Sequence, residues 1–154
     1  MSTSDHCSWY GVSCNTGYYV TVINLPQSGL SGSLPFLKMD KLEYLTLPNN
    51  YLTGAIPNFD MGNLEQMILN DNSLDNGIPA FDKLPNLLDM ILSNNNFSSI
   101  AYVLENCPKL VSIALTNNSH TLLSVHLDLC SAKQNTNLDD FVLDLTGTAS
   151  NCSP

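Results

Sequence analysis

The amino-acid sequence predicts a solenoid, a right-handed stack of coils with a parallel β-sheet along its concave face. Two observations predict it: one apolar phrase recurs at a nearly fixed period, and a proline follows the phrase in three of its copies. The phrase begins at Val20, Leu42, Leu64, Leu87 and Leu110, at intervals of 22, 22, 23 and 23 residues. Such a period is typical of architectures in which each unit buries its apolar face against its neighbours.

The phrase itself has the spacing of a leucine-rich repeat. In its second copy it reads Leu42-x-x-Leu45-x-Leu47-x-x-Asn50-x-Leu52. Inward and outward residues alternate in its first half, so we expect each copy to begin with a short strand. Parallel strands cannot be joined by hairpins, so the chain must return behind the sheet between copies. The first copy has Ser28 in place of the asparagine, and the fifth ends at His120, where an apolar residue is due.

An asparagine column follows the strands, at Asn50, Asn72, Asn95 and Asn118. We expect these buried amides to bond backbone groups of their own turn and of the next coil, because a buried polar group needs partners. Met67 and Met90 fall on inward positions and are expected in the core.

The return stretches begin at Leu34-Pro35, Ile56-Pro57 and Ile78-Pro79. Proline fixes φ and lacks a donor, so we expect the convex side to be extended or 3₁₀ with little α-helix. Four large apolar residues recur before the repeat starts and are expected to fill the convex side of the core. They are Phe36, Phe59, Phe81 and Leu104.

The charge balance limits the partners. The chain has five Lys, no Arg and fourteen Asp plus Glu, for a net charge of −9. Phosphate recognition depends on guanidinium groups and basic patches, so nucleic acid and anionic membranes are poor partners. A protein or peptide ligand carrying Lys or Arg is favoured instead. No apolar run is long enough to cross a bilayer, so we expect no direct membrane insertion.

Residues that carry chemistry are few. The histidines are His6, His120 and His126, and none has a partner at the spacing of a nucleophilic site or a metal site. The stretch from Asp71 to Gly77 resembles a calcium loop only weakly, since its glycine is one place late and the distal glutamate is absent. We therefore predict no enzymatic activity, no cofactor and no metal.

The segment Cys7-Ser8-Trp9-Tyr10-Gly11-Val12-Ser13-Cys14 resembles the N-terminal cap of plant-type extracellular leucine-rich-repeat proteins, Cys-x-Trp-x-Gly-Val-x-Cys. Leu52-Thr53-Gly54-Ala55-Ile56-Pro57 is similar to the Leu-x-Gly-x-Ile-Pro phrase of the same class. That class includes receptor-kinase ectodomains, their short co-receptors, polygalacturonase-inhibiting proteins and kinetoplastid surface antigens. The resemblance implies an extracellular binding module without catalytic residues in its repeats. Trp9 is expected to lie over the apolar end of the first coil.

The cysteines lie where they can staple the open ends of the array. We expect disulfides Cys7–Cys14 and Cys130–Cys152, with Cys107 as a buried free thiol. The alternative is a Cys107–Cys130 disulfide. Either pairing requires an oxidising compartment, so we predict an extracellular or cell-surface location. Residues 1–6 hold no apolar stretch that could act as a signal peptide, so Met1 is interpreted as the start of a trimmed fragment.

The chain thus divides into an N-terminal cap (1–19), five repeats (20–120) and an irregular C-terminal cap (121–154), all within a single domain. Three sequons predict a glycoprotein, at Asn96, Asn117 and Asn151.

The candidate binding site lies on the outward strand positions, the only surface that the fold repeats in register. Tyr44, Ile68 and Ile91 place apolar groups on a face that should be wet, which is typical of a binding patch. Polar and acidic neighbours complete the predicted ligand-binding set; they are Gln66, Asp89, Glu43, Glu65 and Asp71. The alternative is that the two isoleucines merely pack on each other.

We therefore predict an extracellular protein- or peptide-recognition or adhesion module that binds through its concave face, as a fragment of a receptor or surface protein. The alternative is a secreted protein inhibitor of an extracellular enzyme, which would use the same face.

Overall fold

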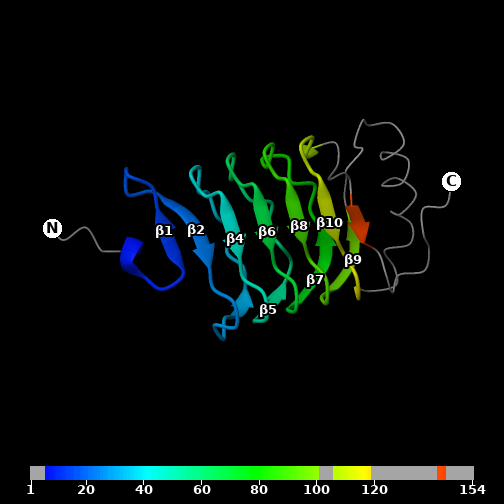
Figure 1. Ribbon diagram of the computed structural model, residues 1–154. Coiled ribbons are helices and arrows are strands. Elements are labelled where there is room, and N and C mark those ends of the chain that lie inside the picture. Colours follow the sequence, from blue (N-terminus) through cyan, green and yellow to red (C-terminus); the bar gives the residue numbers. More distant parts are fainter. Residues whose placement is uncertain (1–5, 101–105, 119–141, 145–154) are drawn as a thin grey trace.

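The chain folds as a row of coils whose strands lie side by side (Figure 1). The computed structural model describes residues 6–100, 106–118 and 142–144. One sheet has seven strands in the order β1-β2-β4-β6-β8-β10-β11. Their bounds are β1 (Val12–Cys14), β2 (Val20–Asn24), β4 (Tyr44–Thr46), β6 (Gln66–Ile68), β8 (Asp89–Ile91), β10 (Ser112–Ala114) and β11 (Val142–Asp144). Neighbours pair in parallel from β2 onward, whereas β1 pairs antiparallel with β2.

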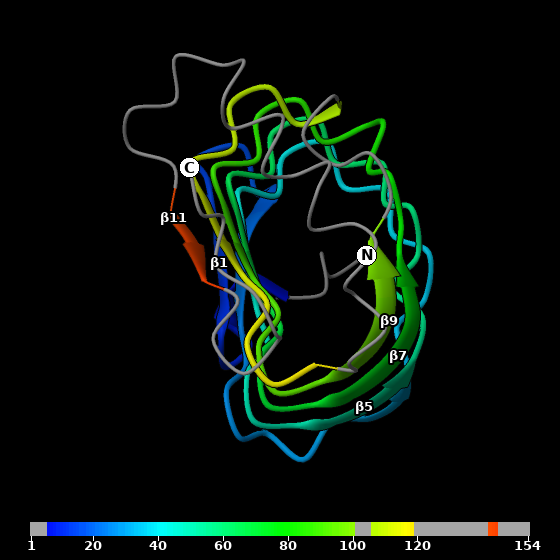
Figure 2. The same cartoon turned by 90° about the vertical axis from the view of Figure 1, so that its right-hand side faces the viewer.

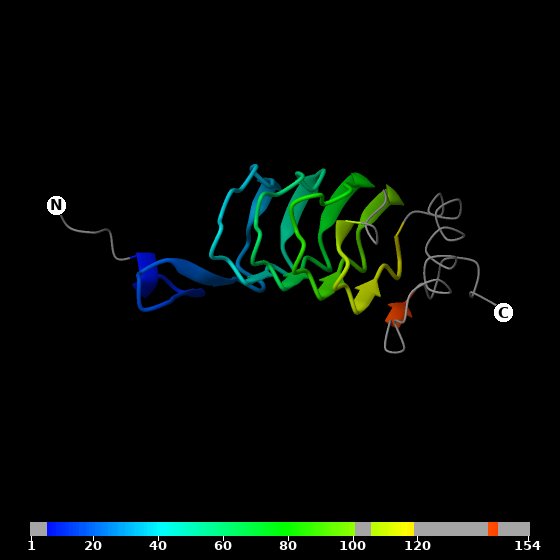
Figure 3. The same ribbon diagram turned by 90° about the horizontal axis from the view of Figure 1, so that it is seen from above.

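This arrangement confirms the predicted solenoid. Each of the five predicted repeats supplies one strand to this sheet; the strands are β2, β4, β6, β8 and β10. A one-turn 3₁₀ helix, η1 (His6–Ser8), and β1 lie before the first repeat, at one end of the row (Figure 3). None of the helices in the described residues has the length and hydropathy of a membrane span.

A second sheet, which the sequence did not predict, runs along the other side of the coils. Its four strands lie in the order β3 (Ser31–Ser33), β5 (Tyr51–Gly54), β7 (Ser73–Ile78) and β9 (Asn96–Ile100). Viewed along the row, β5, β7 and β9 lie across from the seven-stranded sheet (Figure 2). Gly32 and Gly54 adopt φ of 86° and 77°, a backbone that only glycine adopts without strain, so these strands can bend around the corner of the coil.

The core is an apolar stack between the two sheets. Met67 and Met90 are fully buried there, and so are Phe59 and Phe81, as predicted. Leu104 lies outside the described residues. The prediction for Phe36 was wrong: its side chain is 60% exposed. The backbones of Lys38 and Asp60 pair in a parallel β-bridge, so Leu37 rather than Phe36 lies level with Phe59. Leu37 packs against the core.

The asparagine column joins the coils, although the predicted direction was wrong. Each amide bonds its own turn and the preceding coil, not the next one. Asn72 shows the pattern: its Nδ2 donates to Leu69 O of its own coil (3.1 Å) and to Leu47 O of the coil before (3.0 Å). Its Oδ1 accepts from Leu52 N of that same preceding coil (3.0 Å). A repeat pattern is symmetric with respect to both neighbours, so the sequence could not decide between them.

The same bonding pattern explains why the first copy of the phrase has Ser28 in place of the asparagine. Asn50 accepts from Ser28 N and Leu30 N (both 3.0 Å) and donates to Leu25 O (2.9 Å), which completes the turn of the first coil. Ser28 itself occupies the asparagine position of that coil, where no earlier repeat needs completing. The substitution therefore marks the beginning of the array.

The N-terminal disulfide forms as predicted, with the Cα atoms of Cys7 and Cys14 5.5 Å apart. Cys107 is a buried free thiol, also as predicted. Cys130 and Cys152 lie outside the described residues. Trp9 does not cover the first coil: its side chain is 63% exposed and meets His6 edge-on, with ring centroids 6.5 Å apart. The division into caps and repeats remains a prediction.

Candidate functional site

The register of the seven-stranded sheet assembles the predicted ligand-binding residues into rows. Tyr44 pairs with Gln66, and Gln66 pairs with Asp89, across β4, β6 and β8. Ile68 and Ile91 pair in the next row. The residues between these rows, Leu45, Met67 and Met90, are buried, so the two rows themselves face outward. We call this surface, Tyr44, Gln66, Ile68, Asp89 and Ile91, the strand face.

Tyr44 lies at one corner of the strand face and is 37% exposed. Its hydroxyl donates to Glu65 Oε2 at 3.2 Å. This hydrogen bond, together with the negative charge of Glu65 and a smaller contribution from Glu43, raises the pKa of Tyr44 above its usual 10. The hydroxyl thereby lies beside the acidic pair Glu43 and Glu65, in which Glu65 N donates to Glu43 O (2.9 Å).

The centre of the strand face mixes one polar contact with two aliphatic side chains. Gln66 Nε2 donates to Asp89 Oδ2 at 3.5 Å, so the carboxylate keeps lone pairs for another donor. Ile68 and Ile91 are half-buried neighbours. Their partial exposure is compatible both with a binding patch and with the two side chains shielding each other.

Asp71 belongs to a polar ladder along the rim of the strand face, whose side-chain hydrogen bonds the sequence did not predict. Asn94 Nδ2 donates to Asp71 Oδ1 (2.7 Å), and Asn117 Nδ2 donates to Asn94 Oδ1 (2.8 Å). Asp71 also accepts from Asn70 Nδ2. The ladder residues all have φ near 55°, in the left-handed region that Asn and Asp tolerate better than most residues. The signal was present in the sequence, because Asn49, Asp71, Asn94 and Asn117 each directly precede the asparagine column.

Two of the three predicted glycosylation sites are exposed. Asn96 begins β9 on the second sheet, whereas Asn117 lies on the ladder, and its Nδ2 already donates to Asn94. Asn151 lies outside the described residues. These sites therefore remain predictions.

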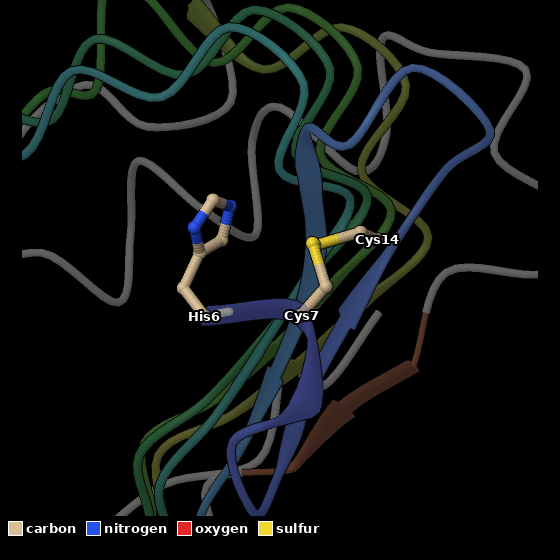
Figure 4. Close-up of side chains that lie close together, drawn as sticks. All are labelled: His6, Cys7 and Cys14. Atoms are coloured by element: carbon tan, nitrogen blue, oxygen red, sulfur yellow. A yellow bond between two sulfur atoms is a disulfide. The ribbon is translucent and has the colours of Figure 1, made fainter. Parts of the chain in front are cut away.

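One cluster in the described part of the chain has donor atoms close enough to suggest a metal: His6, Cys7 and Cys14 (Figure 4). The two sulfurs are bonded to each other and are not thiolates, so they lack the charge that binds metals. His6 Nε2 lies 3.2 Å from Tyr18 O. In the stretch that resembles a calcium loop, Asp71 accepts from two asparagine amides and Asp75 accepts from Asn76. Neither group offers a prepared metal site.

Comparison with solved structures gives several plant receptor ectodomains, while no family model matches the sequence. The BIR2 ectodomain from Arabidopsis thaliana is 28% identical with a TM-score of 0.67, covering 73% of this chain and 64% of that one. The ectodomain of the receptor kinase SOBIR1 from the same plant is 28% identical with a TM-score of 0.64, covering 75% and 71%. The GASSHO1/SCHENGEN3 ectodomain, solved in complex with CASPARIAN STRIP INTEGRITY FACTOR 2, is 33% identical with a TM-score of 0.69, covering 75% and 15%.

The repeat phrase, the cap disulfide and these likenesses define the class of fold: the chain is a leucine-rich-repeat solenoid, and it is similar to plant receptor ectodomains. Within that class, its structural likeness is to the ectodomains of receptor kinases. It spans just under two thirds of the length of the BIR2 ectodomain.

Proposed function

We propose that the chain is a recognition module that binds a protein or peptide through the strand face. The observation that carries the proposal is the register that aligns Tyr44, Gln66 and Asp89 beside Ile68 and Ile91 over three neighbouring coils. The aromatic ring and the two aliphatic groups offer apolar contact area on one outward surface, and the carboxylate beside them offers a charged contact. Two of the similar structures are complexes. One is the complex of BIR3 with SERK2, and the other is GASSHO1/SCHENGEN3 with CASPARIAN STRIP INTEGRITY FACTOR 2. Both support a protein or peptide partner.

The favoured ligand is basic. Glu43, Glu65 and Asp89 give the strand face a negative potential. Two of the chain's five lysines, Lys38 and Lys83, instead pair with Asp60 (3.3 and 3.6 Å), on the return side of the coils. A ligand with Lys or Arg would therefore associate faster at low salt. The cap disulfide supports an extracellular or cell-surface location.

The test is a selection of displayed peptides on the purified chain, followed by affinity measurements on variants. Tyr44→Ala and Ile68→Asp should each weaken binding by more than about 1 kcal/mol, as losses at interface centres do. Asp89→Lys should act mainly through the association rate and its salt dependence. Tyr51→Ala is the matched control, because Tyr51 is an exposed tyrosine on β5 of the second sheet.

Selected peptides that bind all three strand-face variants as well as the wild type would refute this location. If the binding partner proves to be an extracellular enzyme and binding blocks its activity, the chain is instead an inhibitor that uses the same face.

A further inference from the structure

The N-terminal cap leaves its aromatic side chains in solvent. The four rings are exposed to 60–80% of their surface; they are Trp9, Tyr10, Tyr18 and Tyr19. A cap that served only to close the first coil would bury such rings, since burying an aromatic side chain is among the larger apolar gains available. We call these four residues the cap aromatics.

Contacts within the cap bring the segments that carry two of the cap aromatics, Trp9 and Tyr18, together. The Cys7–Cys14 disulfide closes the loop that carries Trp9. His6 meets the Trp9 ring edge-on and lies 3.2 Å from Tyr18 O through its Nε2, so the Trp9 loop and the Tyr18 turn lie close together. Tyr18 has φ of 61°, a left-handed backbone that is unusual for a bulky residue. The backbone of Tyr18 bonds within the cap, whereas its ring is 78% exposed, which points to a role for the ring outside the fold.

The described part of the cap is also free of acidic and basic charge. Residues 6–19 contain no Asp, Glu, Lys or Arg, in a chain whose net charge is −9. Exposed hydroxyls at Ser13 and Thr16 lie among the rings in the sequence. The one aliphatic side chain in this stretch, Val12, is half-buried. The described part of the cap therefore offers aromatic faces and neutral polar groups, with no Asp, Glu, Lys or Arg side chain to pair with a charged partner.

We propose that the cap aromatics form a second binding site, and that it takes neutral carbohydrate chains. The C–H groups on one side of a sugar ring carry a partial positive charge and are attracted to the negative face of an aromatic ring. The sugar hydroxyls can exchange hydrogen bonds with serine, threonine and tyrosine hydroxyls. A stable protein interface buries about 800 Å² on each partner, which is large for so short a cap. A few protruding rings suit a sugar chain better. This site is independent of the strand face.

Trp9 makes the test direct, because it is the only tryptophan in the chain. The whole chain is titrated with soluble neutral hexasaccharides (cellohexaose, laminarihexaose, xylohexaose and mannohexaose) while the tryptophan emission is recorded. At least one should give a saturable change with a Kd of about 1 mM or tighter. Hexagalacturonate, which is anionic, should bind at least tenfold more weakly, because it would approach an acidic chain at a site whose described residues, 6–19, include no Lys or Arg.

Tyr18→Ala keeps the tryptophan reporter and should weaken the neutral sugar by about tenfold or more, and Tyr10→Ala provides a second such variant. Tyr51→Ala, at a tyrosine 70% exposed on the second sheet, should bind as the wild type does. The proposal is overturned if no neutral hexasaccharide saturates the signal, if both cap variants bind as the wild type, or if the anionic sugar binds equally well. Capture of a protein through the cap, with no response to sugars, would also overturn it.

Discussion

Replacing Asn72 by leucine tests the bonding that joins the coils. Asn72→Leu removes the donor to Leu47 O, Leu69 O and Asn70 O, and the acceptor of Leu52 N. The first two carbonyls keep another partner, because Leu47 O also accepts from Asn50 and Leu69 O from Asn95. The buried Leu52 amide loses its asparagine acceptor. We therefore expect a destabilisation of about 1–3 kcal/mol, the cost of roughly one unsatisfied buried donor, rather than the sum of four bonds.

The assay is chemical denaturation followed by far-ultraviolet circular dichroism, since the single tryptophan reports on the cap and not on the coils. Asn58→Leu is the control: Asn58 is exposed and makes one side-chain bond, to Asp82 (2.7 Å). It should change stability by no more than about 0.5 kcal/mol. If Asn72→Leu unfolds at the same midpoint as the wild type, the asparagine column does not hold the turns together, and our account of the solenoid fails.

Three further predictions concern single groups. Burial raises the pKa of the Cys107 thiol to about 11, so the folded chain keeps the thiol proton above pH 9, where the unfolded chain loses it. The free energy of unfolding should therefore fall from pH 9 to 11. Cys107→Ala should remove that part of the fall in a series of denaturation curves. Gly11→Ala should destabilise the cap by about 1–3 kcal/mol, because the φ of Gly11 is 74° and a Cβ there would lie 2.2 Å from Asn24 O. The measurement is an unfolding curve followed by tryptophan emission. An unchanged curve would contradict the strained geometry. Glu65→Gln should lower the pKa of Tyr44 towards 10 in a spectrophotometric titration, with Tyr44→Phe identifying the signal; no change would mean that the hydrogen bond is absent in solution.

The sequence predicted whatever depends on the repeat alone. The inward residues of each phrase, such as Leu45 and Met67, are buried, and the outward ones pair in the predicted columns. The period specifies these positions because a one-residue slip would turn every side chain to the opposite face. The strand-face residues therefore came together as predicted, although their role remains a prediction.

The sequence could not predict what depends on the corners of the coil. Ser31–Ser33 and Ser73–Ile78 do not alternate in hydropathy as a strand does, and their pairing into the second sheet becomes visible only when the coils stack. Phe36 was placed by counting back from the next repeat, but the Lys38–Asp60 bridge shifts the register by one residue. Trp9 lies before the first repeat, where the period carries no information.

Each asparagine of the column bonds the coil before it, so each turn is completed only by the coil that follows it in the sequence. A coil leaves the ribosome with its turn unfinished, and the asparagine that completes it arrives about 22 residues later, as Asn50 does for Ser28 and Leu30. Shortening the array at its C-terminal end therefore exposes one incomplete turn, whichever coil becomes the last. Shortening it from the other end instead leaves an asparagine with no turn to complete, a defect that a serine in that position avoids. An engineered array of these coils should accordingly begin with a coil like the first, with serine at the asparagine position, and end with a segment that supplies the missing amide.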